Sequence, residues 1–212
     1  TDDLLLRAYR ERLFRAAFPA AAGTARLGPE IEYVARAGER APLRSALKED
    51  QIVWARAPVR FDLAGGWTDT PPYSIKHGGR VVNVAVDLNG QPPIQAFARF
   101  AEAPEIVVRS IDLGVHERIR TYDELQQWAK LGSGFGIARA ALALAGFDPA
   151  FHAQGGSRTL RRQLQHELGG GIELSMLAAM PKGSGLGTSS ILAATLLGTL
   201  SELLGLHWTV ND

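Results

Sequence analysis

Residues 171–206 read GIELSMLAAM-PKGSGLGTSS-ILAATLLGTLSELLGL, and this stretch decides the fold. Its first ten residues are typical of a β-strand, which Pro181 ends. Residues 189–204 have the length and apolar content of a buried or amphipathic helix, and their serine, threonine and glutamate residues argue against a membrane span. The sequence therefore predicts a strand, a glycine-rich loop and a long helix in succession.

The loop alternates glycine with other residues at Gly183, Gly185 and Gly187, so its backbone can turn tightly and leave amides uncovered. The hydroxyl residues at 188–190 are expected to open the helix as N-cap residues do. The first amides of a helix lack partners within it and lie at the positive end of its dipole. These features predict a cradle for phosphates, with a hydroxyl contact to Mg²⁺. An ordinary turn between strand and helix is the alternative.

Neither of two common phosphate-binding sequences is present in this loop. No Gly-Lys-Ser/Thr closes it as in a Walker A sequence, and Thr188 stands where the dinucleotide fingerprint has its third glycine. If the loop binds phosphate, it does so without either of these two motifs.

A second polar cluster lies at residues 57–73, which read APVRFDLAGGWTDTPPY. Arg60 is near the end of a predicted strand, and Trp67, Asp69 and Tyr73 lie in the loop that follows. A carboxylate can accept hydrogen bonds from two sugar hydroxyls, an aromatic ring can cover the apolar face of a sugar, and arginine can neutralise a transferring phosphoryl group. The alternative is a surface strand end with an Arg60–Asp69 salt bridge and Trp67 in the core.

The remaining pattern predicts strands first and helices later, which indicates α+β layering. Asn89-Gly90 between two apolar runs predicts a β-hairpin. The expected elements are an extended run at 51–65 broken at Pro58, a loop at 65–74, strands at 80–88, 93–100 and 105–111, and helices at 121–129, 135–146 and 157–168. We expect one domain at 51–212, preceded by an extension at 1–50 that contains a helix at 2–18 and a linker.

Composition limits the classes of partner. The formal net charge of +1 gives no broad basic surface for nucleic acid. The chain has no cysteine, which excludes disulfides and thiolate metal sites and fits a reducing cytoplasm. The charged amino terminus lacks the apolar core of a signal peptide. The five histidines of the chain are scattered and are not spaced as metal ligands. We expect a cytoplasmic protein with no nucleic-acid or membrane partner.

The segment PKGSGLGTSS resembles the second signature of the galactokinase, homoserine kinase and mevalonate kinase (GHMP) family, P-x-G-x-G-L-G-S-S-A. It departs from that pattern mildly, at Thr188 and Ser190. The resemblance implies that ATP and Mg²⁺ are cofactors and that Ser189 approaches the magnesium. It implies a phosphate-binding set made of Lys182, Gly183, Ser184, Gly185, Leu186, Gly187, Thr188 and Ser189.

Residues 57–69 resemble the first GHMP signature, which reads roughly A-P-G-R-V-N-L-I-G-E-H-T-D in galactokinases. The resemblance implies that Arg60 is catalytic and that the sugar is bound by Asp69, Trp67, Thr68 and Tyr73. Asp62 replaces the family asparagine, and Gly66-Trp67 replaces Glu-His, which argues against galactose as the substrate.

The wording AGGWTDTPPYS resembles the kinase part of bifunctional fucokinase/GDP-fucose pyrophosphorylases, a similarity that extends over about 51–212. It implies transfer of phosphate from ATP to the anomeric hydroxyl of a hexose, with L-fucose favoured. Heptose-phosphate kinases share A-G-G-x-T-D and are the enzyme alternative, for which Lys76 and Arg80 are candidate phosphate contacts. A non-catalytic sugar- or nucleotide-binding module, or a structural domain with an incidental glycine loop, is the other alternative.

The resemblance also implies a fold and some missing parts. The fold is the GHMP-kinase amino-terminal domain, ribosomal protein S5 domain 2-like, with a mixed sheet and helices packed on one face. The family's catalytic carboxylate, third glycine-rich signature and carboxy-terminal domain find no counterpart in the sequence. We therefore expect a fragment without meaningful kinase turnover on its own. Its expected partners are the sugar, ATP, the missing carboxy-terminal kinase domain and a fused pyrophosphorylase domain.

Overall fold

The computed structural model describes residues 43, 47–48, 50–129, 134–149, 157–181 and 183–208. The predicted helix at 2–18 and most of the predicted linker lie outside the described residues. Leu43, which the sequence assigns to the extension, is buried in the same core as the domain that follows. The boundary at residue 50 remains a prediction.

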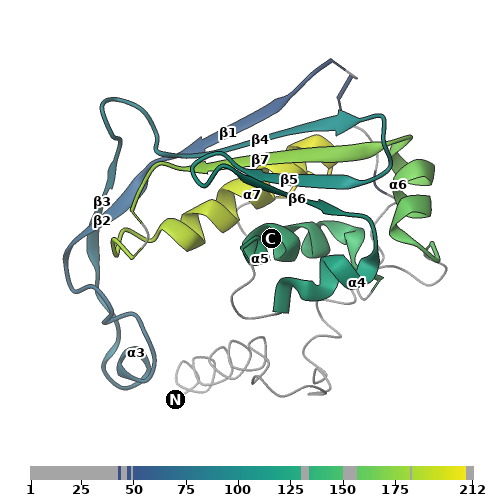
Figure 1. The fold of residues 1–212 in the computed structure, drawn as a ribbon. Coiled ribbons are helices and arrows are strands. Elements are labelled where there is room, and N and C mark those ends of the chain that lie inside the picture. Colours follow the sequence, from purple (N-terminus) through teal and green to yellow (C-terminus); the bar gives the residue numbers. More distant parts are fainter. Residues whose placement is uncertain are drawn as a thin grey trace.

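A five-stranded mixed sheet forms the main layer (Figure 1). Neighbouring strands are antiparallel except β7 and β5, which are parallel, so the predicted mixed sheet is confirmed. The strand order is β1 (Val53–Ala57), β4 (Ile94–Ala101), β7 (Gly171–Ala178), β5 (Ile106–Ser110) and β6 (Val115–Ile119).

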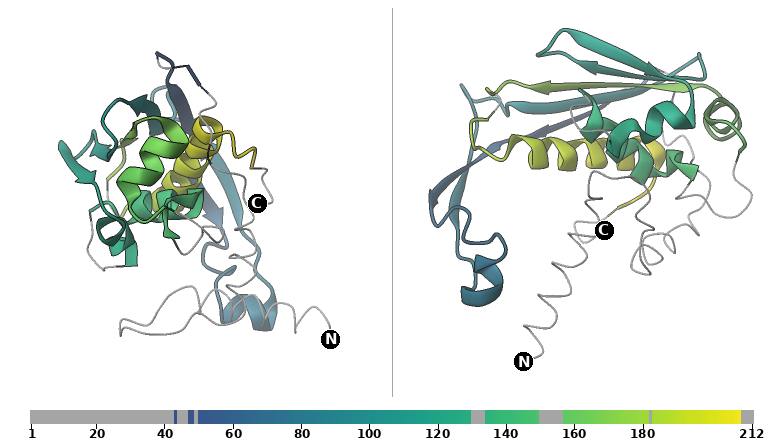
Figure 2. Two further views of the ribbon diagram at one scale, coloured as in Figure 1. Left: turned by 90° about the vertical axis from the view of Figure 1, so that its right-hand side faces the viewer. Right: turned by 60° about the horizontal axis from the view of Figure 1, so that its bottom comes forward.

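Apart from α3 (Tyr73–His77), the described helices cover one face of this sheet and close one of its ends (Figures 1 and 2). The long helix α7 (Thr188–Leu204) runs beneath the strands, which matches the helix predicted at 189–204 to within a residue. The other helical elements are α4 (Tyr122–Leu125) with a 3₁₀ turn at Gln126–Ala129, α5 (Gly136–Leu142) with a π turn at Ala143–Phe147, and α6 (Leu160–Leu168) at the end of the sheet.

The hydrophobic core lies between the sheet and α7 (Thr188–Leu204). On β7, alternate residues Ile172, Leu174 and Met176 are buried because successive side chains of a strand point to opposite faces. On α7, Leu196 and Leu200 are fully buried four residues apart, so they lie on the same helix face. The core thereby fixes the position of the first turn of α7, which lies at the end of the sheet next to strand β2 (Val59–Ala64).

The predicted hairpin around Asn89-Gly90 is only partly correct. Asn89 and Gly90 form a two-residue turn, with φ of 50° and 71°, and Leu88 and Gln91 exchange two hydrogen bonds of 2.9 Å. The strands on either side belong to different sheets, because β4 pairs with β1 and β7. Prolines at 92 and 93 follow the turn at once and cannot donate to a ladder with the preceding strand.

The extended run at 51–65 also divides between two sheets. It breaks at Pro58 into β1 and β2 (Val59–Ala64), and β2 pairs with β3 (Val82–Val86) in a two-stranded ribbon. The ribbon extends away from the main body, with the short helix α3 (Tyr73–His77) beyond it where a continuous loop was predicted (Figure 1). The exposed, charge-rich strand β6 was not predicted. No helix of the described chain has both the length and the apolar content needed to cross a membrane.

Candidate functional site

The glycine-rich loop has the backbone that its sequence suggested. Gly183, Gly185 and Gly187 all lie in the left-handed region, with φ of 77°, 74° and 70°. Residues with a Cβ are strained in this region, which explains the glycine at each position.

The cap of α7 differs from the prediction. Gly187 is the N-cap residue and has no side chain to cap the helix, so the hydroxyl residues begin the first turn instead of capping it. The hydroxyl of Ser190 donates to the carbonyl of Gly187 at 2.9 Å. The amides of the first turn therefore receive no side-chain cap.

Most amides of the loop are available to a ligand. Ser184 N donates to the carbonyl of Pro181 at 3.3 Å, and Ile191 N donates to that of Gly187 at 3.1 Å. Between them, the amides of residues 185–190 donate no hydrogen bond to another described residue. These unpaired donors lie at the positive end of the α7 dipole, which is an arrangement suited to binding an anion.

Strand β2 is connected directly to this loop. Arg60 N donates to the carbonyl of Leu186 at 3.3 Å, which joins the two segments through their backbones. The guanidinium also lies close to the helix start, because a Cβ added to Gly187 would be 3.9 Å from Arg60 Nε. The carboxylate partner of Arg60 is Asp62, at 3.0 Å between Nε and Oδ1, and an Arg60–Asp69 salt bridge is not present among the described residues.

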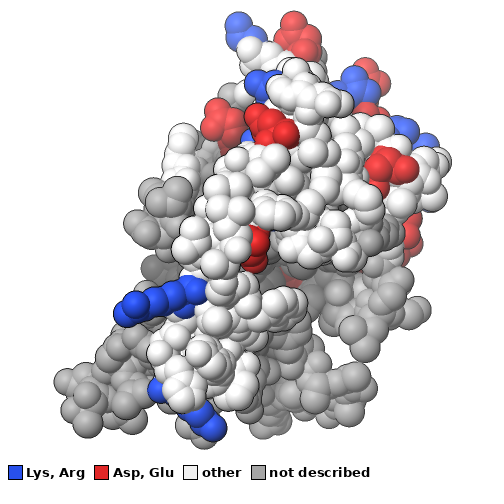
Figure 3. Space-filling model, turned by 90° about the vertical axis from the view of Figure 1, so that its left-hand side faces the viewer, with Lys and Arg blue, Asp and Glu red and all other residues white. Residues whose placement is uncertain are grey.

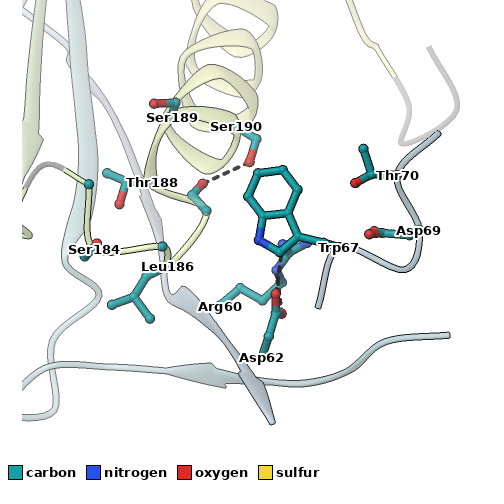
Figure 4. A pocket seen from close by; sticks show the side chains of 13 residues that line it. Arg60, Asp62, Trp67, Asp69, Thr70, Ser184, Leu186, Thr188, Ser189 and Ser190 are labelled. Atoms are coloured by element: carbon teal, nitrogen blue, oxygen red, sulfur yellow. Dashed lines mark hydrogen bonds and ion pairs between the residues drawn. The ribbon is translucent and has the colours of Figure 1, made fainter. Parts of the chain in front are cut away.

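One cleft of about 460 Å³ lies between the glycine-rich loop and the loop that follows β2. Figure 4 shows side chains from both segments around it. The residues that line it are Arg60, Asp62, Trp67, Asp69, Thr70, Gly183, Ser184, Gly185, Leu186, Gly187, Thr188, Ser189 and Ser190.

Sequence reasoning missed three of these lining residues: Asp62, Thr70 and Ser190. Asp62 had a usable signal, because residues two apart on a strand share a face and Arg60 was already a candidate. Trp67 is 82% exposed, so its alternative reading as a core residue is wrong.

Three predicted site residues are not found in the cleft lining. The hydroxyl of Thr68 is engaged within its own loop, since it contacts the carbonyls of Gly65 and Arg80 at 2.6 and 2.9 Å and accepts from Arg80 N at 3.0 Å. Tyr73 lies on α3, with its ring centroid 4.9 Å from that of His77. Lys182 lies outside the described residues.

The face of the molecule shown in Figure 3 has no extended region of positive charge on its described atoms. On the described atoms visible in Figure 3, basic side chains lie apart from one another and form no broad patch. Among the described residues, an anion in the cleft can meet the loop amides and Arg60, which is the one cation in the described lining.

The cleft also offers oxygen atoms that suit Mg²⁺. The hydroxyls of Thr188 and Ser189 and the carboxylates of Asp62 and Asp69 line the same space. Protein-bound Mg²⁺ is typically held by one or two carboxylates together with substrate phosphates, and it keeps several waters. No described group of three or more His, Asp or Glu side chains forms a metal cage. The residues present therefore fit a metal that arrives with a nucleotide.

Sequence comparison finds relatives among sugar kinases. The chain is 56% identical over 163 residues to the L-fucokinase/L-fucose-1-P guanylyltransferase of Bacteroides fragilis. It is 31% identical over 146 residues to the bifunctional fucokinase/GDP-fucose pyrophosphorylase of Arabidopsis thaliana. These matches cover 77% and 69% of this chain but only 17% and 12% of the relatives.

Structural comparison gives the same family of folds. The galactokinase of Lactococcus lactis, solved in complex with galactose, matches with a TM-score of 0.50 and 19% sequence identity. The match covers 76% of this chain and 35% of the galactokinase, and at this identity it bears on the fold alone. Residues 153–212 match the family model described as GHMP kinases N terminal domain. Residues 153–212 are thus similar in sequence to the amino-terminal domain of GHMP kinases, and the mixed α+β fold of the chain resembles that of the solved galactokinase.

Proposed function

We propose that the protein containing this chain is an ATP-dependent sugar kinase that phosphorylates the anomeric hydroxyl of a hexose, with L-fucose as the favoured substrate. The observation that carries the proposal is the uncapped start of α7, whose free amides share one cleft with Arg60 and Asp69. The choice of sugar is supported by the fucokinase activity named in both curated relatives.

On the nucleotide side, the free amides of residues 185–190 would bind the β- and γ-phosphates of ATP, and the hydroxyl of Ser184 lines the same cleft. Lys182, which lies outside the described residues, stays a predicted phosphate contact. The hydroxyl of Ser189 would contact the Mg²⁺ that accompanies the nucleotide. That metal would neutralise charge on the phosphates, as in other phosphoryl transfers. Helix dipole and backbone donors are in place before the nucleotide arrives, so little reorganisation is needed on binding.

On the sugar side, Asp69 would accept hydrogen bonds from sugar hydroxyls, and the exposed indole of Trp67 would cover an apolar face of the ring. Thr68 would act by holding the loop that presents them, since its hydroxyl joins Gly65 to Arg80. Tyr73 lies outside the cleft lining, so we assign it no direct contact.

Arg60 would stabilise the negative charge on the transferring phosphoryl group. Its guanidinium lies between the glycine-rich loop and the loop that follows β2, which we call the sugar-side loop. The two substrates would meet there. Arginine groups in this role typically accelerate phosphoryl transfer by about 10³-fold or more. A carboxylate that orients the acceptor hydroxyl is expected elsewhere in the complete protein, so we expect little turnover by the 212-residue chain alone.

The described lining of the cleft supports a neutral hexose over a heptose phosphate. A phosphorylated sugar would require a second cationic group, and neither Lys76 nor Arg80 lines the cleft. A neutral hexose requires only Arg60 and the loop amides to handle the charge of ATP. We also propose a cytoplasmic location, which fits the absence of cysteine from the chain.

The test is a coupled ADP-release assay on the complete protein with L-fucose, D-galactose and a heptose phosphate. We expect turnover with fucose, and a loss of kcat of about 10³-fold in Arg60→Ala. Turnover with the heptose phosphate but not with fucose would replace the assigned substrate. An unchanged melting temperature of the 212-residue chain in saturating MgATP would argue against the nucleotide site itself.

A further inference from the structure

Asp62 is a carboxylate in the cleft for which neither the sequence motif nor the relatives' names provide a role. It follows Arg60 by two positions on β2, so the two side chains project from the same face of the ribbon. Its side chain is 22% exposed, compared with 44% for that of Arg60. Asp62 is therefore the more buried side chain of the two.

The contact between the two side chains uses both carboxylate oxygens. Arg60 Nε lies 3.0 Å from Oδ1, and the terminal nitrogen NH2 donates to Oδ2 at 3.4 Å. Figure 4 shows the pair beside Trp67 and below the first turn of α7. A guanidinium has further N–H groups in a rigid plane, and those not used by Asp62 remain free for an anion.

From this geometry we propose that Asp62 is a positioning residue, which holds the Arg60 guanidinium beside the start of α7 in the orientation needed to meet a phosphoryl group. The assignment of the phosphoryl group rests on the proposed kinase function. The pairing of the two side chains does not.

Two features of the surroundings make this pairing specific. Oδ1 of Asp62 is buried and accepts no well-aligned hydrogen bond from a described residue, so its charge depends on the nearby Nε. Gly66 leaves space for the carboxylate, since a Cβ there would lie 3.3 Å from Oδ2. A larger side chain at position 66 would crowd Asp62 and shift the arginine with it.

The sign of the charge predicts how the two substrates respond. Asp62 offsets the positive charge of Arg60 before ATP binds, so it weakens the general attraction of the cleft for anions while it fixes the arginine. In Asp62→Asn that negative charge is lost, and the KM for ATP should stay unchanged or fall. The kcat should fall by about 10- to 100-fold, because a poorly oriented group contributes less in the transition state.

The kinetic experiment uses four variants of the complete protein: Asp62→Asn, Arg60→Ala, the double variant and Asn83→Ala. Asn83 is the cross-strand neighbour of Asp62 on β3 and lies outside the cleft lining, so its variant controls for damage to the ribbon. If Asp62 acts through Arg60, adding Asp62→Asn to Arg60→Ala should change kcat by less than about twofold. Full additivity of the two losses would overturn the proposal.

A second measurement does not depend on catalysis. In the ¹⁵N-labelled 212-residue chain, the Nε–H resonance of Arg60 is assigned by its loss in Arg60→Ala. Because Nε lies 3.0 Å from a charged oxygen of Asp62, this resonance should shift in Asp62→Asn but not in Asn83→Ala. An Nε–H resonance that Asp62→Asn leaves unchanged would overturn the proposal. The expected shift in a protein that phosphorylates no sugar would instead reject the kinase function and leave the positioning intact.

Discussion

Replacing Gly185 with alanine tests the central feature of the site, the left-handed backbone of the glycine-rich loop. Gly185 has a φ of 74°, and a Cβ added there would meet no atom within 4 Å. The cost is therefore conformational and not steric, at about 1–2 kcal/mol for an L-residue in this region. Gly114, in the turn between β5 and β6, has a φ of 65° and equally open surroundings, which makes Gly114→Ala a matched control.

Only one of the two variants should lose nucleotide affinity. The loop in Gly185→Ala can relieve its strain by turning the amides away from the cleft, and binding must then restore the strained form. If ATP binding must supply the full 1–2 kcal/mol to restore the strained loop, ATP affinity falls about 5- to 30-fold. The turn at Gly114 is not part of the cleft lining, so its variant should bind ATP as the parent does.

The assay combines urea unfolding with calorimetric titration of MgATP on the same preparations of both variants. The midpoints of unfolding report how much of the strain each folded variant retains in the absence of ATP. A dissociation constant for ATP that is the same in Gly185→Ala and Gly114→Ala would refute the reasoning, because the cradle would then not require the left-handed backbone.

Three further predictions concern the surroundings of the cleft. Thr68→Val removes the hydroxyl that joins the sugar-side loop, so steady-state kinetics should show the KM for sugar rising about tenfold with the KM for ATP unchanged; an equal rise in both would contradict this. Burial, with smaller contributions from Glu167 and Asp148, raises the pKa of Tyr122 to about 12 from an ordinary 10.0. The folded state thus keeps a proton that the unfolded state loses, so the free energy of unfolding should fall as pH rises from about 10 to 12. Urea melts at several pH values should show that Tyr122→Phe lacks this decline, and a variant with the parental slope would refute the assignment. Finally, Phe61 and Val84 are exposed and lie opposite each other on the ribbon. Exposed apolar patches favour association, so we expect the chain to self-associate in light scattering and a variant with serine at both positions to do so less; unchanged scattering would show that this surface is not involved.

Local features explain why much of the fold could be predicted. The strand at 171–178 and the helix at 188–204 follow from side-chain periodicity, and the glycines between them follow from the backbone conformation that each must adopt. The turn at Asn89-Gly90 is correct for the same reason. Its predicted strand pairing is wrong because pairing depends on which apolar faces can be buried together, and prolines at 92 and 93 redirect the chain.

The candidate site likewise has features that the sequence predicts and features that only the tertiary structure reveals. The sequence alone determined which segments are candidates for the chemistry, because glycine, hydroxyl and carboxylate residues have chemical properties that do not depend on the fold. Only the tertiary structure decided that Arg60 lies beside Gly187, that its partner is Asp62 and not Asp69, and that Thr68 supports the loop instead of lining the cleft. These contacts join residues far apart in the chain, or depend on the direction of individual side chains. Both are set by how β2 packs against the start of α7, and no local pattern encodes that packing.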